Sequence, residues 1–95
     1  MEDQDNKEIK VGKKEFMTYI RSIKLLVEQK NKKRVIISAR GKNISKAVDL
    51  AESSKNKFLK DKNISIENIK TYTEAYEKDN KERSVPCISL ELVSN

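Results

Sequence analysis

The sequence predicts a small two-layer α/β sandwich of order β-α-β-α-β-β that ends in a long β-hairpin. Two short runs with strand character, at residues 9–12 and 35–39, are each followed by a segment with the period of an amphipathic helix. Two extended segments, 64–73 and 85–93, flank a polar stretch near the C-terminus. Two parallel strands joined by a helical crossover, followed by an antiparallel hairpin, fit this order.

A charged tail comes before the first strand. Residues 1–8 are polar and show no period, which predicts a disordered tail, and residues 9–95 are expected to form one domain. The strand at 9–12 alternates and ends at Gly12. The helix that follows carries an apolar stripe with helical spacing. Its members are Phe16, Tyr19, Ile20, Ile23, Leu26 and Val27.

The second strand and helix follow a cationic connection at 29–34. Residues 35–39 are almost wholly apolar, as expected for a strand that is covered on at least one face. Asn43 is the predicted N-cap of the next helix, which ends near residues 61–63. The stripe of this helix consists of mostly small residues. They are Ile44, Ala47, Val48, Ala51 and Phe58.

The C-terminal third reads as a hairpin. Residues 77–83 are all polar, and Asp79-Asn80 is the predicted turn. Ile88, Leu90 and Leu92 alternate with polar residues, as one face of a strand does. Pro86 cannot donate to a sheet ladder, so it indicates an edge position or one beyond the sheet.

Charge is segregated along the chain. The net charge is +6, but residues 9–60 hold 15 Lys and Arg against four Asp and Glu, a local excess of +11. Such an excess favours a polyanion-binding surface. The alternative is the dense surface charge of many soluble domains, especially those from hot environments. Hydrophobic residues make up 36%, so the core is thin and further burial in a dimer would help.

Several function classes lack the residues they need. The chain has no histidine and one cysteine, Cys87, so zinc sites and Ser-His or Cys-His catalysis are not expected. We therefore expect no enzyme, no metal and no cofactor. A lone cysteine favours a reducing, cytoplasmic setting. No apolar run approaches the roughly 18 residues of a membrane span. The few aromatic residues are too scattered for a base-stacking platform.

Both predicted strand-to-helix joints carry a glycine and cations. The first joint holds Gly12-Lys13-Lys14, and the second holds Arg40-Gly41-Lys42. Because parallel strands end at the same edge of a sheet, the four cations should cluster there. Such a cluster can clamp a phosphate chain. The alternative is a rim that is basic by chance.

These joints resemble those of the Alba family of small basic archaeal chromatin and RNA-binding proteins. The resemblance covers about residues 9–92 and rests on three segments: Val11-Gly-Lys-Lys14, the run from Ser38-Ala-Arg-Gly-Lys42 to Ile44-Ser-Lys-Ala-Val-Asp49, and Lys57-Phe-Leu59. The family fold is similar to the C-terminal domain of translation initiation factor three. That fold has the strand and helix order expected above.

The resemblance implies a non-catalytic homodimer that coats or compacts chromosomal DNA by largely sequence-independent backbone contacts. It places the protein in an archaeal cytoplasm, on the chromosome. RNA binding on the same surface is the alternative. The candidate nucleic-acid contacts are Lys13, Lys14, Arg40, Lys42, Lys46, Lys78, Lys81 and Arg83.

Two further roles follow from the resemblance alone. Lys13 matches a lysine whose acetylation weakens binding, so an acetylase and a deacetylase are candidate partners. Phe58 matches a contact between dimers along DNA, although a residue that caps the core fits the sequence equally well.

The sequence departs from the family pattern in two places, one a segment and one a single residue. Residues 77–83 are charge-balanced, whereas a hairpin that enters a minor groove should be basic. Lys42 stands where arginine is common, which keeps the charge without the bidentate fork. A function of another class, a module that binds an acidic protein through the basic face, predicts weak binding to duplexes.

Overall fold

A computed structural model describes residues 6–94. The predicted order β-α-β-α-β-β is confirmed. The elements are β1 (Asn6–Lys10), α1 (Phe16–Lys24), β2 (Arg34–Arg40), α2 (Ile44–Ser53), β3 (Ile64–Lys78) and β4 (Lys81–Ser94). Each helix continues into a short π-helical segment, Leu25–Gln29 after α1 and Ser54–Phe58 after α2.

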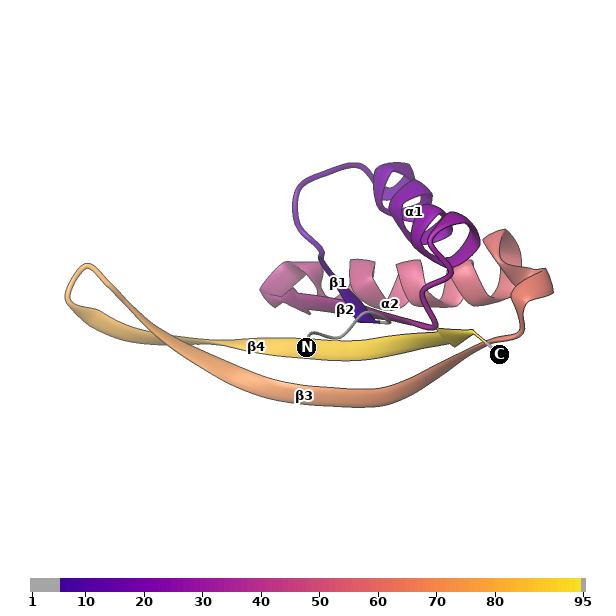
Figure 1. The fold of residues 1–95 in the computed structure, drawn as a ribbon. Coiled ribbons are helices and arrows are strands. Elements are labelled where there is room, and N and C mark those ends of the chain that lie inside the picture. The colour runs from indigo at the N-terminus through magenta and orange to yellow at the C-terminus, as the bar shows by residue number, and fades with distance from the viewer. Residues whose placement is uncertain (1–5, 95) are drawn as a thin grey trace.

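The strands form one four-stranded sheet in the order β1-β2-β4-β3. β1 and β2 are parallel, and β4 pairs antiparallel with both β2 and β3. Both helices lie over the same face of the sheet, while β3 and β4 extend beyond it as a long ribbon (Figure 1). The fold therefore has two layers, and the described helices leave the second face of the sheet open.

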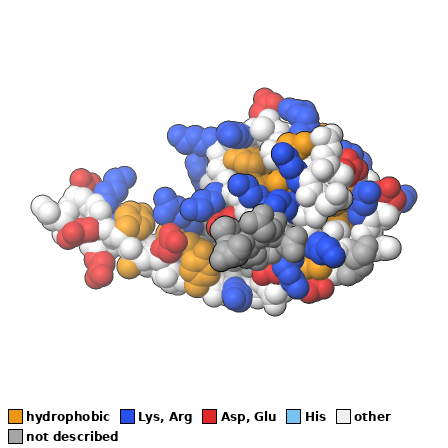
Figure 2. Space-filling model, in the orientation of Figure 1, with side chains coloured by type: hydrophobic (Ala, Val, Ile, Leu, Met, Phe, Trp, Pro, Cys, Tyr) orange, Lys and Arg blue, Asp and Glu red, His pale blue; other side chains and the backbone are white. Residues whose placement is uncertain are grey.

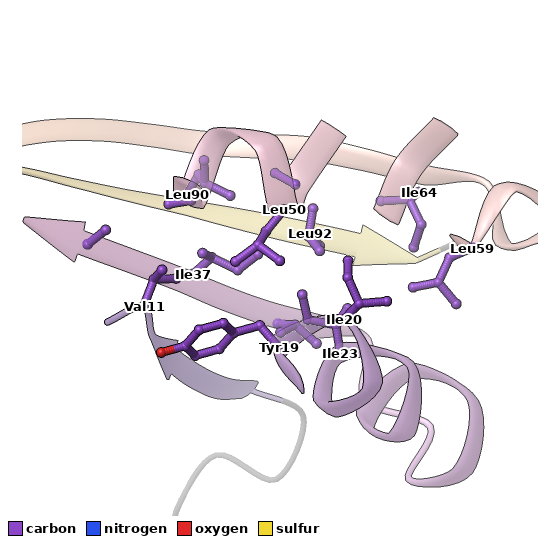
Figure 3. Close-up of a cluster of buried hydrophobic side chains, with 14 of the residues drawn as sticks. Val11, Tyr19, Ile20, Ile23, Ile37, Leu50, Leu59, Ile64, Leu90 and Leu92 are labelled. Carbon is purple, nitrogen blue, oxygen red and sulfur yellow. The ribbon is translucent and has the colours of Figure 1, made fainter. Parts of the chain in front are cut away.

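The core lies between the helices and the inner face of β2 and β4 (Figure 3). Alternate residues of β2 and β4 point into it, with Ile37 paired to Leu90 and Val35 to Leu92. Ile20 and Ile23 of α1 are fully buried against them. Burial of each such side chain contributes about 1.5–3 kcal/mol. Tyr19 is buried as expected.

The first strand begins earlier than expected. Residues 6–8, which we predicted to lie in a disordered tail, are part of β1, and residues 1–5 lie outside the described residues. Polar residues can form this edge strand because its backbone pairs with β2. In addition, Glu8 Oε2 accepts a 2.7 Å hydrogen bond from Ser38 Oγ. Val11 and Gly12 follow the strand, and the Val11 amide donates to the Ser38 carbonyl at 2.9 Å.

The second helix also differs in detail from its prediction. Val48 is 39% exposed, whereas Leu50 is fully buried. The reason is that Ala47, Leu50 and Ala51, spaced i, i+3 and i+4, turn toward the sheet. Asn43 is the N-cap residue of α2, as predicted, but it also closes a 3-10 turn at Gly41–Asn43 and makes no side-chain capping hydrogen bond.

The hairpin of β3 and β4 extends beyond the four-stranded sheet. The last pair between β2 and β4 is Arg40 with Cys87, while the pairing of β3 with β4 continues to Lys78 and Lys81. Pro86 pairs with Thr73 just beyond that end, as its lack of an N–H predicted. We call residues 73–86 the arm.

The turn of the arm is at the predicted place. Asp79 and Asn80 both have positive φ, 55° and 61°, as in the two-residue turns that match the twist of a hairpin.

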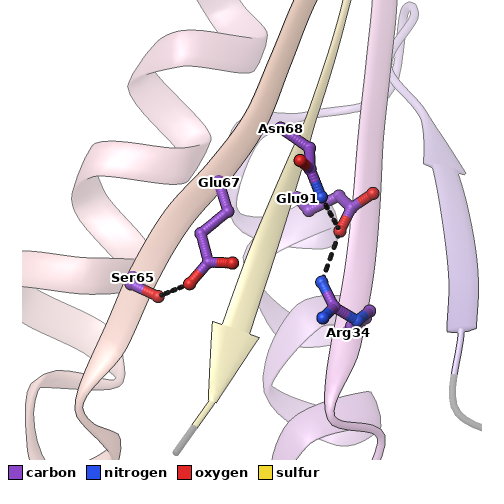
Figure 4. A network of polar contacts seen from close by, with 5 residues as sticks. All are labelled: Arg34, Ser65, Glu67, Asn68 and Glu91. Carbon is purple, nitrogen blue, oxygen red and sulfur yellow. Dashed lines mark hydrogen bonds and ion pairs between the residues drawn. The ribbon is translucent and has the colours of Figure 1, made fainter.

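A polar network on the open face of the sheet marks the other end of the hairpin (Figure 4). Arg34 Nη1 donates to Glu91 Oε1 at 2.7 Å, and Asn68 Nδ2 donates to the same oxygen at 3.0 Å. Asn68 lies in a bulge of β3 with φ of 52°. The network therefore ties β2, β4 and β3 together at the point where the β3 ladder is irregular.

Candidate nucleic-acid interface

The two basic joints lie at one edge of the sheet, because β1 and β2 are parallel and both end there. Lys13 and Lys14 lie in the loop after β1, Arg40 ends β2, and Lys42 lies in the turn before α2. All four side chains are exposed. Figure 2 shows basic side chains gathered where the arm leaves the body of the molecule.

Gly41 is required at the second joint for two reasons. Its φ is +58°, a backbone conformation that residues with a side chain rarely adopt. A Cβ at this position would also lie 3.2 Å from Cγ2 of Val85 in the arm. The glycine therefore lets the turn that carries Lys42 pack closely on β4.

The loop at the first joint is held by side chains from both helices. The Gly12 amide donates to Tyr19 Oη at 2.7 Å. Lys46 Nζ donates to the carbonyl oxygens of Gly12, at 2.8 Å, and Lys14, at 2.5 Å, and lies 5.1 Å from the Tyr19 ring centroid. Lys46, a predicted phosphate contact, thus uses two of its donors within the protein.

A groove of about 590 Å³ connects the two joints with the base of the arm. Lys10, Lys13 and Arg40 contribute its cations, and Tyr72 of β3 and the buried Cys87 of β4 also line it. The structure therefore brings Lys13 and Arg40 to one surface. Sequence reasoning missed Lys10 and Tyr72. Strand alternation, applied to the hairpin, could have placed Tyr72 on this face.

Arg40 already has a partner within the chain. Its Nη1 lies 3.2 Å from Glu74 Oε1 of the arm, and the two side chains are 67% and 47% exposed. An exposed pair of this kind contributes about 0–1 kcal/mol. The pair can therefore open at little cost when a phosphate oxygen competes for the guanidinium group.

Two titratable groups in the groove have shifted pKa values. Desolvation raises the pKa of the Cys87 thiol, Glu74 raises it further, and Arg40 opposes the shift. Desolvation also raises the pKa of the Tyr72 phenol, with further contributions from Cys87, Glu74 and Glu8. The neutral form of each group is thus favoured in the folded chain.

The outer part of the arm, residues 77–83, separates its paired charges by face. Successive side chains of a strand point to opposite faces, and no bulge interrupts the pairing beyond Lys70. Lys78, Lys81 and Arg83 therefore share a face with Tyr72, whereas Glu77 and Glu82 pair on the other face. A sequence that looks charge-balanced thus presents one basic face, and that face continues from the groove.

Phe58 lies at the other end of α2 from the basic joints. It is partly buried against the core, and Lys57 Nζ lies 5.4 Å from its ring centroid. This position fits both of its predicted roles, since one side of the ring packs inward while part of it stays accessible.

Residues 6–94 offer neither a metal-binding cluster nor a membrane-spanning helix. Within residues 6–94, no group of three His, Cys, Asp or Glu side chains is arranged to hold a metal ion. None of the helices in that range is both long and apolar enough to cross a membrane.

Comparison with known proteins decides the family. The Alba family model matches residues 7–73, a segment that contains both joints. The chain belongs to the Alba family. The fold and the resemblance predicted from the sequence are therefore confirmed.

The relatives are archaeal and similar over most of their length. The DNA/RNA-binding protein Alba of Picrophilus torridus is 39% identical over 82 residues, which span 86% of this chain and 89% of the relative. The protein of the same name from Thermoplasma acidophilum has the same identity and coverage.

Solved structures of the Alba family agree with the fold. Alba from Thermoplasma volcanium superposes with a TM-score of 0.79 at 37% identity, covering 90% of this chain and 98% of that one. ALBA1 from Trypanosoma brucei gives a TM-score of 0.72 at 19% identity, over 99% and 72% of the two chains, and supports the fold alone.

Proposed function

We propose that this chain binds double-stranded nucleic acid, largely without regard to sequence, through contacts to the phosphate backbone. The observation that carries the proposal is that Lys13 and Arg40, from different strand-to-helix joints, line one groove. Relatives 39% identical to the chain bear the name DNA/RNA-binding protein Alba. Phosphate contacts carry no sequence information, which accounts for the lack of specificity.

The driving force is release of condensed counterions. Each phosphate neutralised on B-DNA contributes about −0.9 to the slope of log affinity against log salt. If Lys13, Lys14, Arg40 and Lys42 each make one contact, the rim contributes a slope of about −3.6 per protomer. The basic face of the arm adds further contacts, because Lys78, Lys81 and Arg83 lie on the same side as the groove.

As a homodimer, the protein would coat or compact chromosomal DNA without catalysing a reaction. Several large apolar side chains remain exposed, among them Ile69 at 60%. Their burial between two protomers would add to the stability of a domain with few hydrophobic residues, which supports a dimer. Phe58 is the proposed contact between neighbouring dimers. Lys13 is the proposed acetylation site, where loss of one charge would weaken a contact of the rim.

RNA is the alternative ligand of the same surface. The printed name of the relatives includes both polymers. The proposed contacts of Lys13, Lys14, Arg40 and Lys42 are to phosphates, which both polymers carry. DNA and RNA duplexes differ for these contacts in the spacing of their phosphates.

The test is a salt series with one duplex made as DNA and as RNA. We expect log affinity to fall steeply and linearly with log salt, and the tighter polymer identifies the preferred ligand. The Lys14→Ala, Arg40→Ala double variant should lose about two units of slope. A Lys55→Ala, Lys60→Ala variant carries the same charge change away from the two strand-to-helix joints and should lose less.

Two results would contradict the proposal. If the native protein binds both duplexes weakly and without salt dependence, the basic face serves another ligand, such as an acidic protein. If the rim variant and the control variant bind alike at fixed salt, phosphate is bound elsewhere on the chain.

A further inference from the structure

We infer that the groove beside Arg40 holds one unpaired nucleotide, with its base against the ring of Tyr72 and its phosphate near Lys13 and Arg40. The inference rests on the proposed function and adds a ligand class to it, a nucleotide that is not base-paired. It concerns a single base at one ring, in contrast to the extended stacking platform that the sequence argues against.

The aromatic wall is the first argument. Tyr72 lines the groove and is 44% exposed, so a large part of its ring faces solvent rather than the core. A base stacked on an accessible aromatic ring gains affinity whatever its identity, because every base has a π-face. A fully paired duplex keeps its bases stacked on each other and cannot use this ring.

The distance between the aromatic and cationic walls is the second argument. Arg40 pairs with Cys87, and Cys87 pairs with Tyr72, so Arg40 and Tyr72 lie two strands apart. Two strand spacings amount to about 10 Å. This is on the scale of one nucleotide, whose phosphate can meet the cations while its base reaches the ring. The groove volume of about 590 Å³ lies within the range of small-ligand sites.

The remaining lining is the third argument. Glu8, Glu74 and Asn43 also line the groove. The carboxylates of Glu8 and Glu74 repel phosphates, so a surface that bound only the phosphate backbone of a nucleic acid would gain nothing from these two side chains. They can instead accept hydrogen bonds from the amino groups on a base edge, as acidic side chains do with cytosine. In a base pair, one N–H of such an amino group bonds to the partner base, whereas an unpaired base leaves both N–H bonds free for the protein.

The experiment compares a duplex that carries one bulged 2-aminopurine with the same duplex fully paired, at one salt concentration. We expect the native protein to bind the bulged duplex about 5- to 150-fold more tightly and to quench the 2-aminopurine fluorescence. Tyr72→Leu should abolish both effects, and Tyr72→Phe should retain them. Each probe is made as DNA and as RNA, and the polymer with the larger ratio is the preferred source of the nucleotide.

Tyr76 provides the matched control. It is 45% exposed and lies on the same face of β3 as Tyr72, but it does not line the groove. Tyr76→Leu should therefore keep the preference for the bulged duplex. Thermal unfolding of each variant, followed by circular dichroism, verifies that it folds.

The outcomes separate this inference from the proposed function. Equal affinity of the native protein for bulged and paired duplexes overturns the inference and leaves the backbone contacts in place. A preference that survives Tyr72→Leu, or that is lost in Tyr76→Leu, overturns the assignment to this groove. Absence of salt-dependent binding to any duplex instead means that the proposed function has failed.

Discussion

At the scale of single residues, the ammonium group of Lys46 lies between the loop after β1 and the ring of Tyr19. It donates to two backbone carbonyls of that loop, while the Tyr19 hydroxyl accepts from the Gly12 amide. The loop that presents Lys13 and Lys14 is thus fixed by hydrogen bonds to both helices. We therefore interpret Lys46 as a residue that positions the loop.

The Lys46→Met variant tests this interpretation. We expect it to lower the free energy of unfolding by about 1 kcal/mol, because hydrogen bonds to the loop are lost. Lys42→Met is the matched control, since Lys42 is exposed and should change stability by less than about 0.5 kcal/mol. Lys42→Met should instead lower the salt slope by about one unit. Equal loss of stability in the two variants, measured by urea unfolding, would show that Lys46 has no such role.

Cys87 gives a prediction about pH. The thiol is 2% exposed, and desolvation raises its pKa above the ordinary value of 9.0. Because the raised pKa favours the neutral thiol in the folded state, its contribution to stability is complete below the ordinary pKa. That contribution is lost as pH rises through the raised value. The free energy of unfolding should therefore fall more steeply above about pH 9 in the native chain than in Cys87→Ala. Parallel curves in urea unfolding at several pH values would contradict this.

At the scale of elements, the arm predicts that its two faces differ in function. Lys78→Ala with Lys81→Ala removes two cations from the face shared with Tyr72, and should lower the salt slope for duplex binding by up to two units. Glu77→Gln with Glu82→Gln changes the opposite face. This control should leave the slope nearly unchanged. The measurement is a fluorescence anisotropy titration across a salt series, and similar effects of the two pairs would refute the division into faces.

The type and order of the elements could be predicted from the sequence, but their exact phase and neighbours could not. Periodicity located α2, yet it assigned Val48 to the core in place of Leu50, because the helix stripe allows more than one rotation. Residues 6–8 carry no strand pattern, and only pairing with β2 makes them a strand. The cations of the joints could be predicted to meet, since parallel strands share an edge. The ion pair of Arg40 with Glu74 could not, because it depends on which strand lies next to which.

At the scale of the whole molecule, the shape is elongated. The radius of gyration is 14.3 Å, against about 12 Å for a compact chain of this length. The principal extents are 48, 32 and 19 Å. Figure 1 shows that the arm accounts for the long axis. The body therefore contains the core, and the arm offers reach without contributing to it.

This division predicts that the arm can be shortened without loss of the fold. Replacing residues 76–83 by Asn-Gly removes only exposed side chains and supplies a favoured hairpin turn. The core is untouched, so the thermal midpoint followed by circular dichroism should stay within about 4 °C of the native value. The shortened chain should cover fewer base pairs per protomer and show a smaller salt slope, because the basic face of the arm is gone. An unfolded variant would show that the arm supports the body, and unchanged binding would show that the arm makes no contact with the duplex.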